Sequence, residues 1–248
     1  ARRSLESADI IVANHSLMFS DLVLKEQGAS VLPDYQYLII DEAHNIEHVA
    51  EEHFGINVTN RGVKYMLNGL FNPRTHKGLL THLDGDKAID VVGTAMARSR
   101  EVFRKVEDWY EASEAENQGR CYKHFVDDTL SESLKNLRGQ LSRLIRGTDD
   151  EDDKFELGRY SDQIAMTVEN LQNFLDQERD GQVYWVERSG AGAVRLKSAA
   201  VNVGPDIKRT LFEQYSSVIL TSATLSCGSG DEKQGFEFFA SRIALEDF

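Results

Sequence analysis

Cysteine is nearly absent from this chain of 248 residues, which contains only Cys121 and Cys227. The two cysteines lie far apart in unlike contexts, so they form neither a disulfide framework nor a metal-ligand pair. We expect both to be unpaired. The length suits one large domain or two modest ones, each with its own core.

Long apolar runs are absent as well. No segment approaches the ~20 apolar residues that span a bilayer, and no charged start followed by an apolar stretch marks a signal peptide. We therefore expect a cytoplasmic protein without a membrane partner. The chain opens with Ala1 where a complete protein would have methionine, and we expect it to be a piece of a longer protein.

Basic residues are scarce, because 28 Lys and Arg face 41 Asp and Glu for a net charge of −13. This balance argues against a broad nucleic-acid-binding surface but allows a narrow track. Two groups of basic side chains could neutralise phosphates or could equally lie on solvated helix faces. The first group is Arg98, Arg100, Arg104 and Lys105, and the second is Lys135, Arg138, Arg143 and Arg146.

A phosphate-binding loop is missing. The sequence contains no Gly-x-x-x-x-Gly-Lys-Ser/Thr, so it offers no such loop of backbone amides to cradle phosphates. We therefore expect the chain alone not to hydrolyse ATP.

The most informative segment that is present is Tyr37-Leu38-Ile39-Ile40-Asp41-Glu42-Ala43-His44. Its unbroken apolar run predicts a parallel strand buried on both faces, and ligands bind at the carboxyl ends of such strands. One carboxylate there can hold the magnesium of a nucleotide while its neighbour activates water. Asp41, Glu42 and His44 are therefore the candidate catalytic residues.

A second apolar run, Ser217-Val218-Ile219-Leu220-Thr221, leads into Ser222-Ala223-Thr224. Together the two segments resemble the DEAH box and motif III of helicases. A large helical insert separates them, and this spacing resembles the XPD/DinG type of superfamily 2 DNA helicase, whose first motor domain carries an arch insertion. Ala8 to Met18 and Phe236 to Arg242 are similar to flanking segments of the same family.

The resemblance implies an α/β fold, a partial RecA-like parallel sheet with a mainly helical arch and a small β-hairpin. Residues 1–52 would begin the motor domain, 53–182 would form the arch, and 183–248 would return to the motor. The resemblance also implies that the protein binds ATP with Mg²⁺, that Asp41 holds the Mg²⁺ through water, and that Glu42 activates the attacking water. It implies that ATP hydrolysis is coupled to movement along DNA by four residues: His44, Ser222, Ala223 and Thr224. It also implies a monomer that moves 5′-to-3′ on single-stranded DNA in repair or replication. The resemblance leaves open whether the longer protein carries an iron–sulfur cluster, but neither Cys121 nor Cys227 matches a cluster position.

Hydrophobic periodicity predicts the insert. Residues 8–14 and 37–41 are expected strands, and residues 60–71, 89–110, 130–144 and 160–175 are expected helices, the last two paired as a hairpin. The acidic run 149–153 between them should repel itself into a mobile loop. Residues 184–187 and 194–196 flank a glycine-rich loop and predict a β-hairpin. Residues 206–215 predict a short helix.

Two alternatives remain. His44-Asn45-Ile46-Glu47-His48 fits H-x-x-E-H, the inverted zinc-peptidase signature, although its three fixed residues match often by chance. The arch could also act without chemistry, as a module that grips single-stranded DNA or a partner protein.

Overall fold

The computed structural model describes residues 5, 7–26, 30–83, 85–190, 192–226 and 232–245, with the backbone alone at 232–234. The chain forms two compact units. Unit 1 comprises Ala1–Gly55 and Ala199–Phe248, and unit 2 comprises Ile56–Ser198. The α/β class is confirmed, since a parallel pair of strands lies in one unit and a helical bundle with a small sheet in the other.

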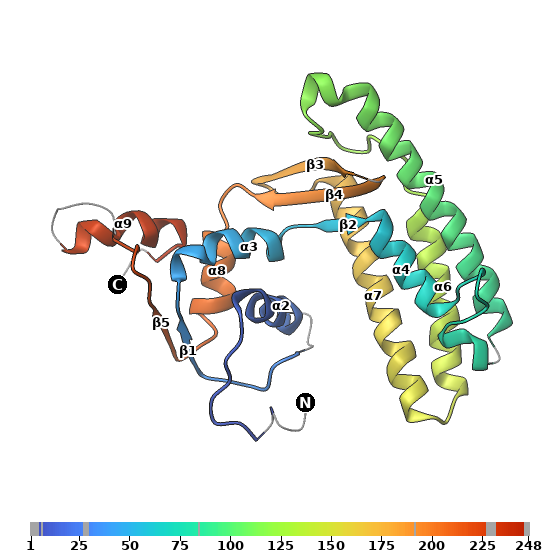
Figure 1. The fold of residues 1–248 in the computed structure, drawn as a ribbon, viewed down its shortest axis with the longest axis horizontal. Helices are drawn as coiled ribbons and strands as arrows, with labels where there is room; N and C mark the ends of the chain where they lie inside the picture. The colour runs from blue at the N-terminus through green and yellow to red at the C-terminus, as the bar shows by residue number, and fades with distance from the viewer. Residues whose placement is uncertain are drawn as a thin grey trace. The chain divides into compact units, whose positions relative to one another are not determined.

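Unit 1 is built on two parallel strands from opposite ends of the chain, β1 (Tyr37–Ile40) and β5 (Ser217–Leu220), which lie side by side in Figure 1. The helices of this unit are α2 (His15–Glu26), α3 (Ile46–Phe54), α8 (Gly204–Ile207) with the π-helical turn η3 (Lys208–Phe212), and α9 (Glu232–Arg242). Ile40, Ile46 and Ile207 belong to one buried cluster, so these elements share a core.

The expectation that β1 is buried on both faces is wrong. Tyr37 and Ile39 are each 70% exposed, whereas Ile40 on the opposite face is only 2% exposed. Side chains alternate along a strand, and within the described residues only the face that carries Ile40 is covered by the core of the unit. An apolar run alone cannot reveal how many faces find partners.

The predicted strand over residues 8–14 is also wrong, because these residues form no strand. Ile10 and Val12 are 83% and 94% exposed, and no described strand pairs with this segment. A strand needs a neighbour for its backbone groups, and the apolar character of residues 8–14 does not supply one.

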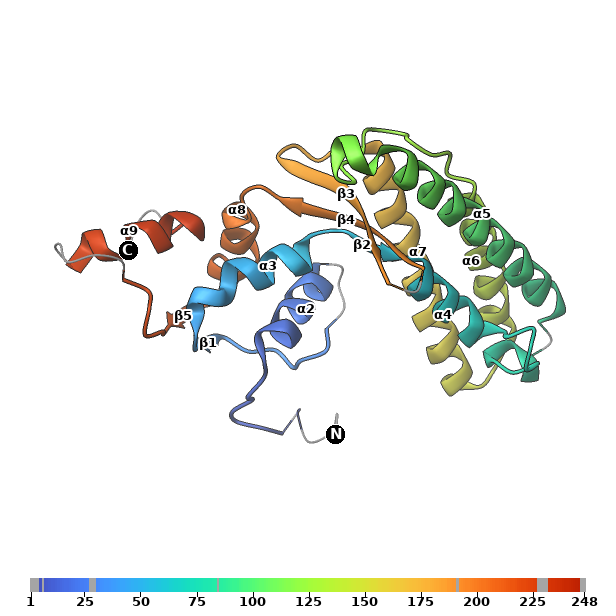
Figure 2. The same cartoon turned by 45° about the horizontal axis from the view of Figure 1, so that its top comes forward.

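Unit 2 is a helical bundle that carries a small sheet. Its long helices are α4 (Asn60–Leu70), α5 (Asp86–Asn117), α6 (Leu130–Gly147) and α7 (Glu151–Asp176), with the 3-10 turn η2 (Leu79–His82) before α5. Figures 1 and 2 both show α6 and α7 packed along their length as a hairpin, as predicted. Leu134, Leu137 and Leu141 are fully buried, which confirms that the leucine stripe is core.

The acidic run begins a helix instead of forming a mobile loop, because residues 151–153 lie in the first turn of α7 and Asp150 is its N-cap. The carboxylate of Asp150 accepts hydrogen bonds from the backbone N–H groups of Asp152 and Asp153, at 2.9 and 3.0 Å, and α7 begins at Glu151. Acids are favoured at a helix N-terminus because they satisfy free N–H groups and the positive end of the dipole. Here these local interactions outweigh the mutual repulsion of the carboxylates.

The small sheet has the order β2–β4–β3, from β2 (Asn57–Thr59), β3 (Gln182–Ser189) and β4 (Ala193–Ala200). The predicted hairpin is thus present, although Ala191 of its loop lies outside the described residues. Tyr184 and Val186 of β3 are buried in the core of unit 2. The hairpin therefore packs with the helices, whereas the expected division at residues 182 and 183 assigns it to the motor.

Cys121 is buried and unpaired, and burial raises the pKa of its thiol to about 12, so it is held as an unreactive thiol. Cys227 lies outside the described residues. Among the helices that the structure describes, none is both long and apolar enough to cross a membrane.

Candidate active site

The two motif-bearing loops meet at the carboxyl ends of β1 and β5. The strands are parallel and in register, with Ile40 opposite Leu220, so both loops leave the same edge of the sheet. The N–H of Thr221 donates to the Ile40 carbonyl, and the N–H of Ala43 donates to the Thr221 carbonyl, both at 2.9 Å. These bonds continue the ladder past the strands and fix one loop against the other.

Asp41 presents an exposed carboxylate at this edge. The hydroxyl of Thr221 donates to its Oδ1 at 2.6 Å, and this bond, with further contributions from the Glu42 backbone N–H and His15, holds the pKa of Asp41 below its ordinary value. His15 Nε2 donates to the backbone carbonyl of Asp41 at 2.8 Å. Asp41 therefore presents an ionised carboxylate, and its loop is fixed from two sides.

Glu42 has a left-handed backbone, with φ of 50° and ψ of 43°, immediately before the 3-10 turn η1 (Ala43–Asn45). This conformation costs a residue with a side chain about 1–2 kcal/mol, and the hydrogen bond from Ala43 to Thr221 helps to maintain it. The turn directs Asp41 and Glu42, adjacent in sequence, toward different partners.

A network of side chains joins Glu42 to the second loop. The hydroxyl Oγ of Ser222 lies 2.8 Å from His44 Nδ1, 3.3 Å from Glu42 Oε2 and 3.5 Å from Thr224 Oγ1. His44 Nδ1 is itself 3.3 Å from the same Glu42 oxygen. The two distant motifs therefore meet at the Ser222 hydroxyl.

Ser222 can donate only one hydrogen at a time. When Nδ1 of His44 carries no hydrogen, it accepts the hydrogen of Ser222. When Nδ1 carries the hydrogen, as in the other tautomer, it acts as the donor and the Ser222 hydrogen is available to Glu42. The hydrogen bonding of Glu42 thus depends on the state of its neighbours across the two loops.

The remaining residues frame this network. Ala223 lies in the exposed turn between Ser222 and Thr224, and the buried side chain of Leu225 anchors that turn in the core of unit 1. Asn14 caps α2, because its Oδ1 accepts the N–H of Leu17 at 2.8 Å. The cap fixes the start of the helix that carries His15.

Two residues of the site are not among the candidates that the sequence motifs single out. Thr221 contacts the Asp41 carboxylate and His15 contacts the Asp41 carbonyl. The available signal for Thr221 is its position, directly before Ser222 at the end of a strand. No sequence pattern links His15 to Asp41, because their contact depends on how α2 packs in unit 1.

The geometry does not support the zinc-peptidase alternative. His44 is directed to Ser222, Glu47 forms an ion pair with Arg242, and His48 Nε2 lies 3.9 Å from Glu52. Among the described residues, no three or more His, Cys, Asp or Glu side chains form a group that could hold a metal ion.

Magnesium bound together with a nucleotide has a different requirement. Mg²⁺ prefers oxygen ligands and retains several waters, so one or two carboxylates and phosphate oxygens complete its shell. The lowered pKa of Asp41 keeps its exposed carboxylate ionised. Asp41 therefore fits such an ion, whereas the sequence itself contains no phosphate-binding loop.

Comparison with known proteins adds to this geometry. Residues 1–63 match the DEAD_2 family model. The whole chain is 24% identical over 256 residues to the ATP-dependent DNA helicase YoaA of Haemophilus influenzae, and 99% of it aligns at 24% identity with YoaA of Escherichia coli. It is also 22% identical over 293 residues to the 3′-5′ exonuclease DinG of Bacillus subtilis.

The chain spans only 30% to 37% of the length of these three relatives. The family model covers the region of Asp41 and Glu42, and the alignments extend through the second motif. The predicted relationship to the DinG/XPD type of helicase is thereby confirmed.

Proposed function

We propose that this relative of the DinG/XPD-type helicases is part of an ATP-dependent DNA helicase, in which the Asp41–Ser222 edge forms half of the nucleotide-hydrolysing site. The observation that carries the proposal is the hydrogen-bonded junction of the two loops, in which Thr221 contacts Asp41 and Ser222 contacts Glu42. Motor proteins need such a junction, because a change at the nucleotide must reach another part of the chain.

Asp41 would hold Mg²⁺ through water, and the ion would neutralise charge on the phosphates. Glu42 would accept a proton from the attacking water. The bond between the terminal phosphorus and its bridging oxygen would break, and ADP would leave with the electron pair of that bond. Thr221 keeps Asp41 ionised and oriented throughout.

His44, Ser222, Ala223 and Thr224 would couple this step to movement. A change in the charge or position of Glu42 alters which partner receives the Ser222 hydrogen. The position of Thr224 then changes with that of Ser222, because the Thr224 N–H donates to the same hydroxyl at 3.3 Å. The state of the nucleotide is thus transmitted to the segment that follows β5.

The relatives' names, which specify DNA helicases, support DNA as the substrate. We extend the proposal to a monomer that moves 5′-to-3′ on single-stranded DNA, acts in the cytoplasm, and serves repair or replication. The chain by itself should not hydrolyse ATP, since its sequence has no phosphate-binding loop.

The test is ATP hydrolysis by the full-length protein, with and without single-stranded DNA. Glu42→Gln should lower the stimulated rate by about 100-fold or more, because it removes the general base. Glu52→Gln on α3 makes the same substitution at an exposed side chain and should retain the rate. Equal rates for both variants would refute the role of Glu42.

A further inference from the structure

Unit 2 contains a groove between α4 and α5 with a volume of about 750 Å³. Five basic side chains line it: Arg61, Lys64, Arg74, Arg100 and Arg104. We call this set the basic groove. Arg61 and Lys64 are three residues apart on α4, and Arg100 and Arg104 are four apart on α5, so each pair shares one helix face.

The charge of the basic groove is largely uncompensated. Within the described part of the chain, Lys64, Arg74, Arg100 and Arg104 form no ion pair with a carboxylate, and all four are exposed. Among the described residues that line the groove, Glu107 is the one acid, and it is paired because it lies 3.1 Å from Arg188.

Other basic residues of α5 behave differently. Arg98 and Lys105 lie 2.9 and 3.4 Å from the two oxygens of Glu101. The basic run of α5 therefore divides into a neutralised pair and an unneutralised pair, Arg100 and Arg104, which faces the groove. Arg100 and Arg104 thus add charge to the groove lining that no carboxylate among the described residues pairs with.

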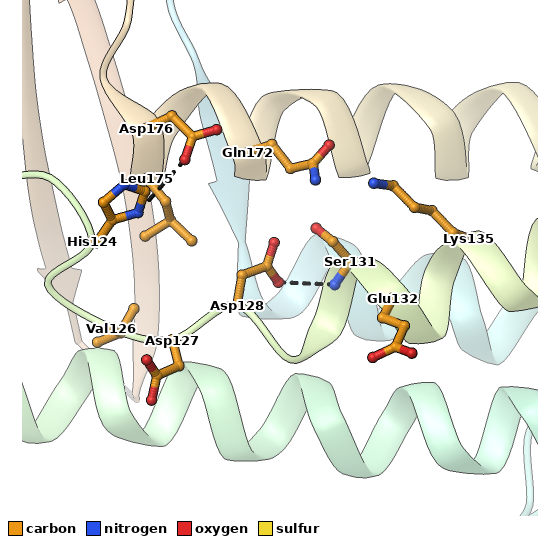
Figure 3. Close-up of a pocket in the computed structure, with 10 residues that line it drawn as sticks. All are labelled: His124, Val126, Asp127, Asp128, Ser131, Glu132, Lys135, Gln172, Leu175 and Asp176. Carbon is orange, nitrogen blue, oxygen red and sulfur yellow. Dashed lines mark hydrogen bonds and ion pairs between the residues drawn. The ribbon is translucent and has the colours of Figure 1, made fainter.

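The charge of the lining differs between this groove and another cavity of unit 2. A cavity of about 600 Å³ lies near the start of α6 and the end of α7. Figure 3 shows the residues that line it, among them the acids Asp127, Asp128, Glu132 and Asp176 and the base Lys135. In a chain of net charge −13, the basic groove is thus a local concentration of positive charge.

The lining also suits a polymer. Buried Leu67, Met96 and Phe103 supply an apolar floor, and asparagine amides such as Asn68 add hydrogen-bond donors. Cations that follow a concave track beside apolar surface match a single nucleic-acid strand, whose charged backbone alternates with apolar sugars and bases.

We infer that the basic groove binds the backbone of single-stranded DNA, through Lys64, Arg74, Arg100 and Arg104. The choice of DNA rests on the proposed function, but the contacts belong to unit 2 and require neither ATP nor Asp41 and Glu42. A duplex and an acidic protein segment are the competing occupants, and the test separates them.

The experiment measures binding of a fluorescein-labelled oligothymidylate to the chain of residues 1–248 by fluorescence anisotropy, over a range of salt concentrations. Arg100→Gln/Arg104→Gln should weaken binding about tenfold or more at low salt. It should also reduce the slope of log K against log salt by about 1.4, at ~0.7 for each lost phosphate contact on a single strand.

The matched control is Arg98→Gln/Lys105→Gln, which removes the same charge from the same helix but from side chains paired with Glu101. It should bind within about twofold of the native chain. Circular dichroism checks that both variants remain folded. Glu42→Gln should also bind normally, which separates this inference from the fate of the proposed function.

Several results would overturn the inference: no binding by the native chain, equal losses in both double variants, or equal affinity for a duplex of the same length. Displacement of the oligothymidylate by a polyglutamate peptide at equal charge concentration would assign the groove to an acidic protein segment instead.

Discussion

The hydroxyl of Thr221 donates a 2.6 Å hydrogen bond to the carboxylate of Asp41, although 180 residues separate the two in sequence. The pairing of β1 with β5 brings them together. The contact joins the first residue of the Asp-Glu-Ala-His motif to the residue directly before the Ser-Ala-Thr triplet. Most of the chemistry proposed for unit 1 depends on it.

Thr221→Val should raise the pKa of Asp41 toward its ordinary value, because the hydroxyl is the largest cause of its lowering. A carboxyl with a lowered pKa in the folded state contributes stability above its ordinary pKa and loses it as pH falls through the folded value. Titration of the Asp41 carboxyl by NMR measures the shift. Thr224→Val should leave that pKa unchanged, and an equal shift in both variants would contradict this cause.

Ser222→Ala should weaken the junction of the loops without removing the general base. One lost hydrogen bond is worth about 1 kcal/mol, or roughly a fivefold change in rate. The full-length variant should therefore lose DNA stimulation of ATP hydrolysis by about that factor and retain more activity than Glu42→Gln. A loss as large as that of Glu42→Gln would show that Ser222 acts in the chemical step itself.

Leu137→Ala should destabilise unit 2 by about 2–5 kcal/mol, the usual cost of a cavity at a buried leucine, because Leu137 is fully buried in α6. Urea denaturation followed by circular dichroism measures the change. Phe155→Ala on α7 removes a larger but exposed side chain and should cost less than about 0.5 kcal/mol. Similar costs for the two variants would contradict the packing of the bundle.

Asp150→Ala should cost about 1 kcal/mol, because it removes the cap of α7. Asp149→Ala, one residue earlier and outside the helix, removes the same charge and should have little effect. The same denaturation experiment compares them. If Asp150→Ala were the more stable variant, repulsion within the acidic run would outweigh the cap.

Sequence patterns predict a helix or strand correctly where the element is determined by the need to bury one of its faces. The leucine stripe of α6 and the apolar runs of β1 and β5 predict their elements, because hydrophobic periodicity reports the face that must be buried. The same patterns cannot tell that Tyr37 and Ile39 face away from the core. Whether the second face of a strand is buried depends on the helices that pack against it, and the residues of the strand itself do not determine that packing.

In the candidate site, too, the sequence predicts some residues, whereas others are found only from the packing of the fold. The motifs identify Asp41, Glu42 and Ser222 as chemically capable residues, but the contact of His15 with the Asp41 carbonyl arises from the packing of α2. The acidic run departs from its prediction for a related reason. Its net charge predicts repulsion, whereas two hydrogen bonds to the single carboxylate of Asp150 decide the outcome.

The most direct test of one shared site is a double-mutant cycle on the DNA-stimulated ATP hydrolysis of the full-length protein, with Glu42→Gln, Ser222→Ala and the two combined. Residues that act as a unit are strongly non-additive. The double variant should therefore be no slower than Glu42→Gln alone, which itself should be almost inactive. Full activity of Glu42→Gln, or losses that simply multiply in the double variant, would contradict a single site built from the two loops.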